Sequence, residues 1–227
     1  MIFSAEFEFI LRAIALTMIM TAWIFARLFS GLSVLHPWFG SMTAGLVASL
    51  AACMGVVPGV GPVPSTLAYS AALLTGVLFC TGVRFEATGL RPKRITYAAM
   101  AIVAVALAVG LQTLVPTPAM RILITHTFVG LSFAASLLWL RQLLRTTSRS
   151  AGAALVGFLA VGVLVDRALP LAQNFVAQGK PFWAFAFPYI GRSDIFVIFA
   201  TGSAMVFYST ERARRRRIQA SLEGAYD

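Results

Sequence analysis

The chain has 227 residues, of which 59% are hydrophobic and 11% charged, and its formal net charge is +10. Soluble domains carry about 25% charged residues, so this composition excludes a water-soluble globular protein. The basic residues stand beside apolar segments, which favours contact with anionic lipid headgroups over nucleic-acid binding. The two cysteines, Cys53 and Cys80, lie inside apolar segments and give no disulfide framework.

Seven apolar stretches follow one another along the chain, and each reaches the roughly 20 residues that a spanning helix needs. They cover 9–29, 41–60, 66–84, 95–115, 119–140, 151–175 and 189–209. Only helices satisfy their own backbone hydrogen bonds in lipid, so the pattern predicts an all-α, polytopic membrane helical bundle. Turns are predicted at 58–65 and 116–118, and interfacial connections at HPWFG (36–40) and KPFWAFAFPY (180–189).

Basic residues set the predicted orientation. Three segments, 84–94, 141–149 and 212–217, together with Arg27 hold 13 of the 18 lysines and arginines. Seven transmembrane helices place all of them on one side, and the positive-inside rule makes that side cytoplasmic. We therefore expect the N-terminus outside and the C-terminus in the cytoplasm. Gly152, Gly157 and Gly162 form a small-residue stripe that predicts close helix packing in the sixth span.

Ionisable groups at membrane depth are costly and mark candidate sites. A set near the outer ends of the spans shares one height, at ~1.5 Å of rise per residue, and predicts a ligand-binding pocket open to the outside. Its members are Arg12, Arg121, His126, Asp166, Arg167, Arg192 and Asp194. The alternative is interfacial charge pairing, for example between Glu8 and Arg12, with His126 a hydrogen-bonded packing residue.

Catalytic motifs are missing from the sequence. It contains no Gly-rich phosphate loop, HExxH, CxxC or nucleophile elbow, and we predict no metal and no cofactor. Lys93 and Lys180 lie in predicted loops, which excludes a retinal Schiff base in the last span. His36 and His126 are predicted on opposite sides of the membrane, which argues against paired haem ligation. We therefore do not expect this chain to be an enzyme on its own.

The tail STERARRRRIQASLEGAYD continues the last span without a breaker until Gly224. Its good helix formers predict a helix that runs on into the cytoplasm. It divides the chain into a transmembrane sensor-like domain (1–211) and a basic signalling or linker helix (212–227). Its arginines serve either as an anchor on anionic headgroups or as signal output, the latter set being Arg212, Arg214, Arg215, Arg216 and Arg217.

Three stretches give the chain a resemblance to a known class. They are AYSAALLTGVLFCTGVRFEATGLRPKRI (68–95), SLLWLRQLLRTTSRSAGAALVGFLAVGVLVDRALP (136–170) and SDIFVIFATGSAMVFYSTERARRRRIQASLE (193–223). These stretches contain apolar spans, basic loops and a charged helix that leaves the membrane after the last span. In these features they resemble the multi-span N-terminal sensor regions of bacterial GGDEF diguanylate cyclases and sensor histidine kinases. No cyclase or kinase motif occurs here, so no catalytic residue carries over.

The resemblance implies a sensory input module in the bacterial inner membrane. It would relay an outer-side ligand or membrane signal through the last helix to a cytoplasmic effector. Expected partners are membrane lipids, a small-molecule ligand, the effector and a second copy in a homodimer, but no nucleic acid. The alternatives are a small transporter or channel, which the absence of an internal repeat disfavours, and an accessory subunit of a membrane complex.

Overall fold

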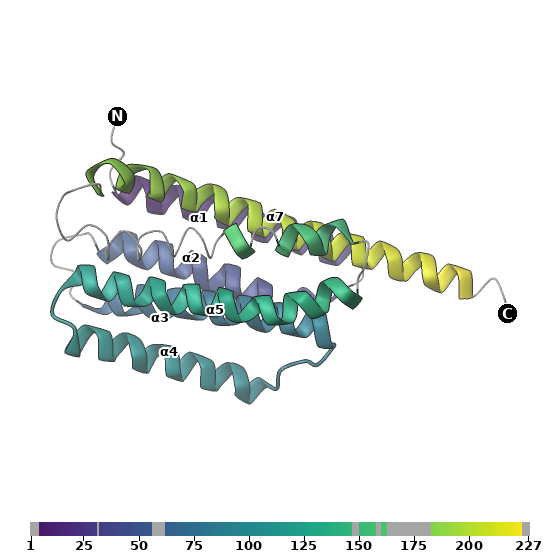
Figure 1. Cartoon of the computed structure of the whole chain (residues 1–227), viewed down its shortest axis with the longest axis horizontal. Coiled ribbons are helices and arrows are strands. Elements are labelled where there is room, and N and C mark those ends of the chain that lie inside the picture. Colours follow the sequence, from purple (N-terminus) through teal and green to yellow (C-terminus); the bar gives the residue numbers. More distant parts are fainter. Residues whose placement is uncertain are drawn as a thin grey trace.

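A computed structural model describes residues 5–30, 32–55, 62–146, 150–157, 160–162 and 183–223, except for the side chains of 5–8, 119, 146, 183–199 and 223. All regular structure in these ranges is helical (Figure 1). The long helices are α1 (Ala5–Phe29), α2 (Pro37–Gly55), α3 (Val63–Thr88), α4 (Arg94–Leu114), α5 (Pro118–Thr146) and α7 (Trp183–Glu223). A shorter apolar helix runs over Ala151–Gly162 and is called the 151–162 helix below.

Five of the described helices are long and apolar enough to cross a membrane: Phe9–Phe29, Pro37–Gly55, Val63–Thr88, Arg94–Leu114 and Met120–Arg145. The predicted all-α, multi-pass membrane bundle is thereby confirmed. The second half of the sixth predicted span lies outside the described residues. Seven crossings and their orientation stay predictions.

Helix α2 begins four residues earlier than the sequence suggested. The ring nitrogen Nδ1 of His36 accepts a hydrogen bond from the backbone N–H of Trp38 at 3.1 Å, which caps the helix. Pro37 stands at the first helical position, where its missing N–H costs nothing. The prediction of HPWFG as a connection is therefore wrong. It forms the first turn of α2 and buries Trp38 completely.

Helix α3 ends four residues later than predicted, at Thr88. Gly89 follows with a φ of 73°, and its N–H donates to the carbonyl of Phe85 at 2.8 Å. This left-handed cap is the usual way for a helix to end on glycine. Arg84 and Glu86 are consequently helical, and the connection to α4 is shorter than the predicted segment 84–94.

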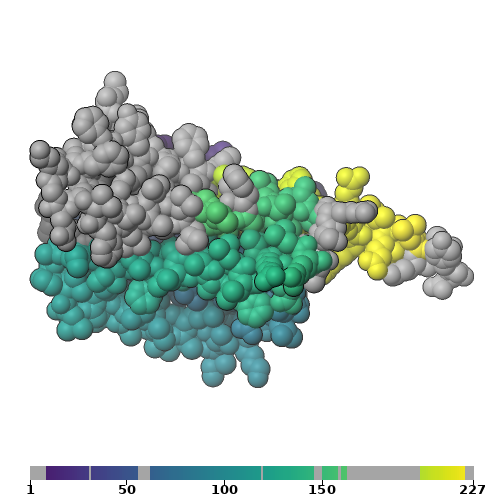
Figure 2. All heavy atoms as spheres, viewed as in Figure 1, coloured from purple at the N-terminus to yellow at the C-terminus, as the bar shows by residue number. Residues whose placement is uncertain are grey.

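Helix α7 is continuous from Trp183 to Glu223, which confirms the predicted helical tail. It also includes most of KPFWAFAFPY, so the prediction of a connection there is wrong as well. The part of α7 that follows Ala213 is exposed and extends beyond the bundle, as the yellow segment in Figures 1 and 2 shows.

The long helices pack side by side around α3, with α2 and α4 antiparallel to it and α5 parallel to it (Figure 1). Helix α3 contacts α2, α4 and α5, while α1 lies between α2 and α7. The end of the bundle where α1, α3 and α5 terminate is also the end from which α7 emerges. We call it the arginine-rich end, because Arg27, Arg91 and Arg212 meet there.

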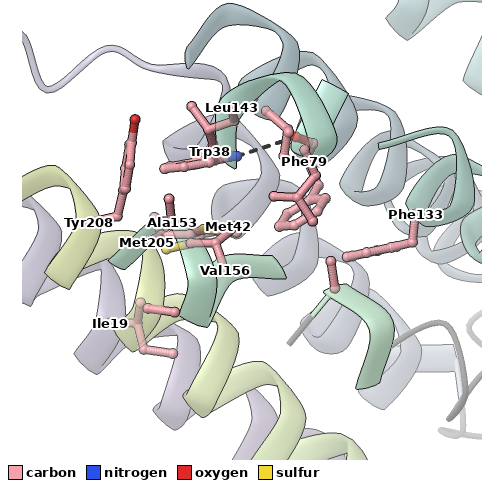
Figure 3. Packing of buried hydrophobic residues seen from close by; sticks show 14 of the residues in the cluster. Ile19, Trp38, Met42, Phe79, Phe133, Leu143, Ala153, Val156, Met205 and Tyr208 are labelled. Atoms are coloured by element: carbon pink, nitrogen blue, oxygen red, sulfur yellow. Dashed lines mark hydrogen bonds between the residues drawn. The ribbon is translucent and has the colours of Figure 1, made fainter. Parts of the chain in front are cut away.

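An aromatic cluster joins four of these helices near the arginine-rich end (Figure 3). The indole N–H of Trp38 donates to the carbonyl of Phe79 at 3.3 Å, and its ring meets the edge of Tyr208 at a centroid distance of 5.8 Å. Phe79 stacks on Phe133 at 4.3 Å. Gly82 makes room for Trp38, since a Cβ at position 82 would lie 2.1 Å from the indole Cδ1.

The predicted glycine stripe contributes to packing at two of its three positions. A Cβ on Gly152 would lie 2.7 Å from the Cα of Tyr208, so the 151–162 helix and α7 touch backbone to backbone there. A Cβ on Gly157 would lie 3.0 Å from the side chain of Leu140. Gly162 has no described atom within 4 Å of that position. The stripe therefore serves helix packing at its first two members.

Candidate functional site

A cavity of about 210 Å³ lies between α1, α2, α3, α5 and α7. Most of its wall is apolar, and a few hydroxyl groups interrupt it. Arg12 of α1 and His126 of α5 both line this cavity. These two residues were predicted to share a pocket, and the structure brings them to one. The volume far exceeds the about 10–15 Å³ that a single water needs, so the cavity has room for a small ligand.

Most hydroxyls of the cavity wall donate hydrogen bonds to backbone carbonyls. Thr75 and Thr125 donate to carbonyls of their own helices at 3.0 and 2.8 Å. Ser41 donates across the α2–α3 contact to the carbonyl of Thr75 at 2.8 Å. Thr201 of α7 differs, because its buried hydroxyl has no hydrogen-bond partner among the described residues. A buried hydroxyl left in this state costs about 1–3 kcal/mol, which an occupant with a polar group can recover.

Arg121 does not line the cavity. Its Nε donates to the carbonyl of Val115 at 2.6 Å, and its Nη1 donates to Oε1 of Gln112 at 2.5 Å. A third, longer bond of 3.4 Å reaches the carbonyl of Pro116. The side chain therefore closes the turn between α4 and α5. This local role was not foreseen.

The structure does not describe the side chains of the remaining members of the predicted pocket. Asp166 and Arg167 lie outside the described residues. Arg192 and Asp194 belong to the first part of α7, of which the backbone is described. The predicted set is thus represented in the cavity by Arg12 and His126, and ligand binding by the whole set stays a prediction.

A second constellation, which the sequence reasoning missed, lies at the arginine-rich end. Glu86 of α3 forms a salt bridge with Arg212 of α7 and accepts a hydrogen bond from Nε2 of His36 at 2.9 Å. The side chains of Glu86 and His36 are only 5% and 2% exposed. With Arg27, these residues are called the Glu86 cluster.

His36 is neutral in this cluster. Its Nδ1 already accepts the N–H of Trp38, so the ring proton resides on Nε2 and points to Glu86. Burial, followed by the positive charges of Arg27, Arg212 and Arg91, lowers the pKa of His36 to about 2. Burial, followed by Arg216, also lowers the pKa of Arg212. Three arginines thus surround one buried carboxylate and one neutral imidazole.

Arg27 completes the cluster from α1. It is buried, and its guanidinium lies over the ring of Trp23 at 4.4 Å from the centroid. Such a contact stabilises a cation by roughly 0.5–2 kcal/mol, depending on how far it is desolvated. The indole N–H of Trp23 in turn donates to the carbonyl of Val34 at 3.2 Å. The arginine is therefore held in place by aromatic stacking.

Two further contacts hold α7 where it leaves the bundle. Arg217 donates to the carbonyl of Phe29, the last residue of α1, at 2.6 Å. Glu211 accepts the hydroxyl of Ser150 at 2.8 Å and the N–H of Gly152 at 3.0 Å. A carboxylate at the first turn of the 151–162 helix satisfies backbone N–H groups that have no partner within that helix. Together with Arg212, these are the exit contacts of α7.

A sequence signal for Glu86 existed. Phe79, Val83 and Glu86 follow the spacing of one helix face, and all three are buried. Because of the neighbouring arginines, 84–94 was predicted as a loop, and the predicted helix therefore ended too early. Extending α3 to Gly89, the first residue that favours a helix end, would have placed Glu86 on the buried face.

Within the described ranges, no three His, Cys, Asp or Glu side chains come close enough to hold a metal ion. The two cysteines are free thiols in half-buried positions. The candidate chemistry is therefore that of hydrogen bonds and ion pairs at two places, the cavity and the Glu86 cluster. No protein-family model, no curated protein and no solved structure matches the chain.

Proposed function

We propose that the chain is a membrane-embedded sensory input module. A small amphipathic molecule in the cavity changes the packing of α7, and α7 carries the change to a cytoplasmic effector of the diguanylate cyclase or histidine kinase type. One observation carries this proposal. Thr201, Gly202 and Met205 line the cavity, and the same unbroken helix reaches the Glu86 cluster with Arg212.

Helices α7 and α1 are tightly packed against each other beside the cavity. A Cβ on Gly202 would lie 2.4 Å from the side chain of Ile19, so this side chain of α1 packs directly against the backbone of α7. An occupant that displaces Met205 or bonds to Thr201 would move α7 along or away from α1. About two turns of helix separate Met205 from Arg212, so the displacement would reach the exit contacts without a hinge.

A signal also requires two packings with different affinities for the ligand. A difference of 1.4 kcal/mol in binding free energy shifts their ratio by about tenfold. The exit contacts supply a first packing in which Arg212, Glu211 and Arg217 are all bonded. Loss of one or more of these bonds defines the second. Pairing of two copies through their exit helices would then bring two effectors together.

The proposed topology places the arginine-rich end in the cytoplasm of a bacterium and the N-terminus outside. The positive-inside rule supports it, since basic residues of α1, of the α3–α4 connection and of α7 gather at one end. Arg12 belongs to the opposite half of α1, so the cavity extends toward the proposed outer side.

The proposal can be tested without knowing the ligand. Ala72→Phe fills the cavity from α3, and Leu67→Phe adds the same ring to the exposed face of that helix. Spin labels on cysteines replacing Ile95 and Ile218, two exposed positions, report the distance between the bundle and the exit helix. Cys53 and Cys80 are replaced by alanine, and the full chain is reconstituted in vesicles.

We expect Ala72→Phe to shift the distance distribution and Leu67→Phe to leave it unchanged. Identical distributions in both variants would mean that the cavity is not coupled to α7, and the sensory proposal would fail. Ion or solute flux across the vesicles that Ala72→Phe blocks would instead favour the channel or transporter alternative.

A further inference from the structure

A groove of about 430 Å³ lies beside the Glu86 cluster, over the face of α3 and between the starts of α2 and α4. It shares His36 with the cluster but no residue with the cavity. Its walls differ in character. One is apolar, with Leu35, Phe39 and Leu78, and the other is polar, with Arg91, Arg94 and Tyr97.

The two arginines of the groove are available to an anion. Both are exposed, and neither has a carboxylate partner among the residues that the structure describes. The guanidinium of Arg91 lies over the ring of Phe85, which also lines the groove, at 5.8 Å from the centroid. Guanidinium groups match the spacing of phosphate oxygens and bind them with paired hydrogen bonds.

The surroundings of the groove favour negative charge. Arg27, Arg91 and Arg212 all act on His36, and the one carboxylate described beside His36 is that of Glu86, which is bonded to Arg212. Positive charge therefore exceeds negative charge at this end of the bundle. A bound anion beside Arg91 would offset part of this excess at short range.

We propose that this groove binds an anionic phospholipid, with its phosphate between Arg91 and Arg94 and an acyl chain along Leu35, Phe39 and Leu78. Basic pockets beside membrane-spanning helices are suited to anionic headgroups. The apolar wall points to a lipid and not to free phosphate. Just beyond the groove, α4 presents Ile95 and Ile102, 75% and 69% exposed, where acyl chains continue the contact. The site does not depend on the cavity or on the proposed sensory function.

The test measures lipid retention by the full chain. Protein in micelles containing equal amounts of phosphatidylglycerol and phosphatidylcholine is analysed by native mass spectrometry, which counts the bound lipids of each kind. We expect the wild type to retain phosphatidylglycerol preferentially. An arginine that contacts the bound headgroup contributes about a fivefold preference, so Arg91→Gln with Arg94→Gln should reduce the preference by at least tenfold.

Matched controls separate this groove from general electrostatics. Arg141→Gln with Arg145→Gln removes the same charge from exposed positions of α5 and should keep the preference. Leu35→Ser, at a position 84% exposed, should weaken phosphatidylglycerol retention without affecting the fold. Millimolar inorganic phosphate or glycerol 3-phosphate should not displace the lipid.

Three results would overturn the proposal: an unchanged preference in the Arg91 and Arg94 variant, an equal loss in the Arg141 and Arg145 variant, or displacement of the lipid by inorganic phosphate. The last would assign the groove to a soluble anion. If the double variant does not fold, the Leu35→Ser variant and the phosphate competition on the wild type still decide the question.

Discussion

The two regions that α7 touches, the Glu86 cluster and the cavity, are built in different ways. In the Glu86 cluster, Glu86 is bonded to both His36 and Arg212, and the aromatic rings of Trp23 and Trp38 contact His36. In the cavity, the α7 hydroxyl of Thr201 is buried without a described partner beside about 210 Å³ of space.

The difference indicates which region holds the helix and which can receive something. The bonds of Glu86 to His36 and Arg212 resist change, because breaking either of them leaves a desolvated partner, although Nε of Arg27 in the same cluster has no hydrogen-bond partner among the described residues. A buried hydroxyl without a described partner is stabilised when a molecule in the adjoining cavity forms a hydrogen bond with it. Removing the carboxylate of Glu86 should therefore be costly, and removing the cavity hydroxyl of Thr201 should be nearly neutral. The predictions that follow test this contrast, beginning with the largest effect.

Glu86→Ala should have the greatest consequence. It leaves Arg212 and His36 without their shared acceptor, and removing one partner of a buried ion pair costs about 3–5 kcal/mol. The side chain of Arg212 is 32% exposed and can reach water, so we expect the lower end of that range. The measurement is the unfolding free energy in mixed micelles titrated with sodium dodecyl sulfate. Glu86→Gln, which keeps an acceptor for His36, should cost less than Glu86→Ala; equal losses would show that the hydrogen bond to His36 contributes nothing.

Gly82→Ala tests the same end through packing. The new Cβ would lie 2.1 Å from Trp38, a contact that forces the indole to move, and overpacking of this kind costs about 1–3 kcal/mol. Gly45→Ala is the matched change at the cavity, where the new Cβ would meet Leu16 at an ordinary 3.4 Å. It should leave stability unchanged or raise it slightly, since alanine favours helix. Thermal unfolding of both variants checks the contrast, and similar midpoints would remove it.

Acid should weaken the cluster through His36. The folded pKa of about 2 lies below the unfolded value of 6.5, so the unfolded chain binds the extra proton between these values. The stability that His36 contributes is therefore complete above pH 6.5 and is lost as the pH falls toward 2. The loss approaches 1.4 kcal/mol per pH unit, or about 2 kcal/mol between pH 6.5 and 5.

The control for acid sensitivity is His36→Asn. Asparagine retains an acceptor for the N–H of Trp38 but does not titrate. Its unfolding free energy should change less between pH 6.5 and 5 than that of the wild type. The groups facing His36 are Glu86 from α3, Arg27 from α1, Arg212 from α7 and Arg91 from the connection. Parallel pH dependences in the two proteins would assign the acid sensitivity to another group.

The sequence was most informative where the membrane restricts the structure. Apolar length predicted the five spanning helices to within a few residues, and the run of helix formers after Tyr208 predicted the extension to Glu223. Arg12 and His126, which were predicted at one height, both line the cavity, and ligand binding there stays a prediction.

The Glu86 cluster could not be predicted from height alone. Its pairing depends on which helices are neighbours and how each is rotated, and one sequence does not give either. The bond between Arg212 and Glu86 joins α7 to α3, residues 126 positions apart in the chain. Arg121 was assigned to the pocket for a related reason: its height was right, but the carbonyl of Val115 lies closer.

The smallest expected effect is also the most direct test of the cavity. Thr201→Val replaces a buried hydroxyl by a methyl group of similar shape, and a hydroxyl without a partner contributes no hydrogen bond to lose. The change in unfolding free energy should lie within about 0.5 kcal/mol of zero or be stabilising. Ser41→Ala is the comparison, because that hydroxyl bonds across α2 and α3, and its loss should cost about 1 kcal/mol. If Thr201→Val costs as much as Ser41→Ala, the hydroxyl of Thr201 has a partner. If it is neutral for stability yet changes the spin-label distances at the exit helix, the hydroxyl serves the coupling between cavity and helix and not the fold.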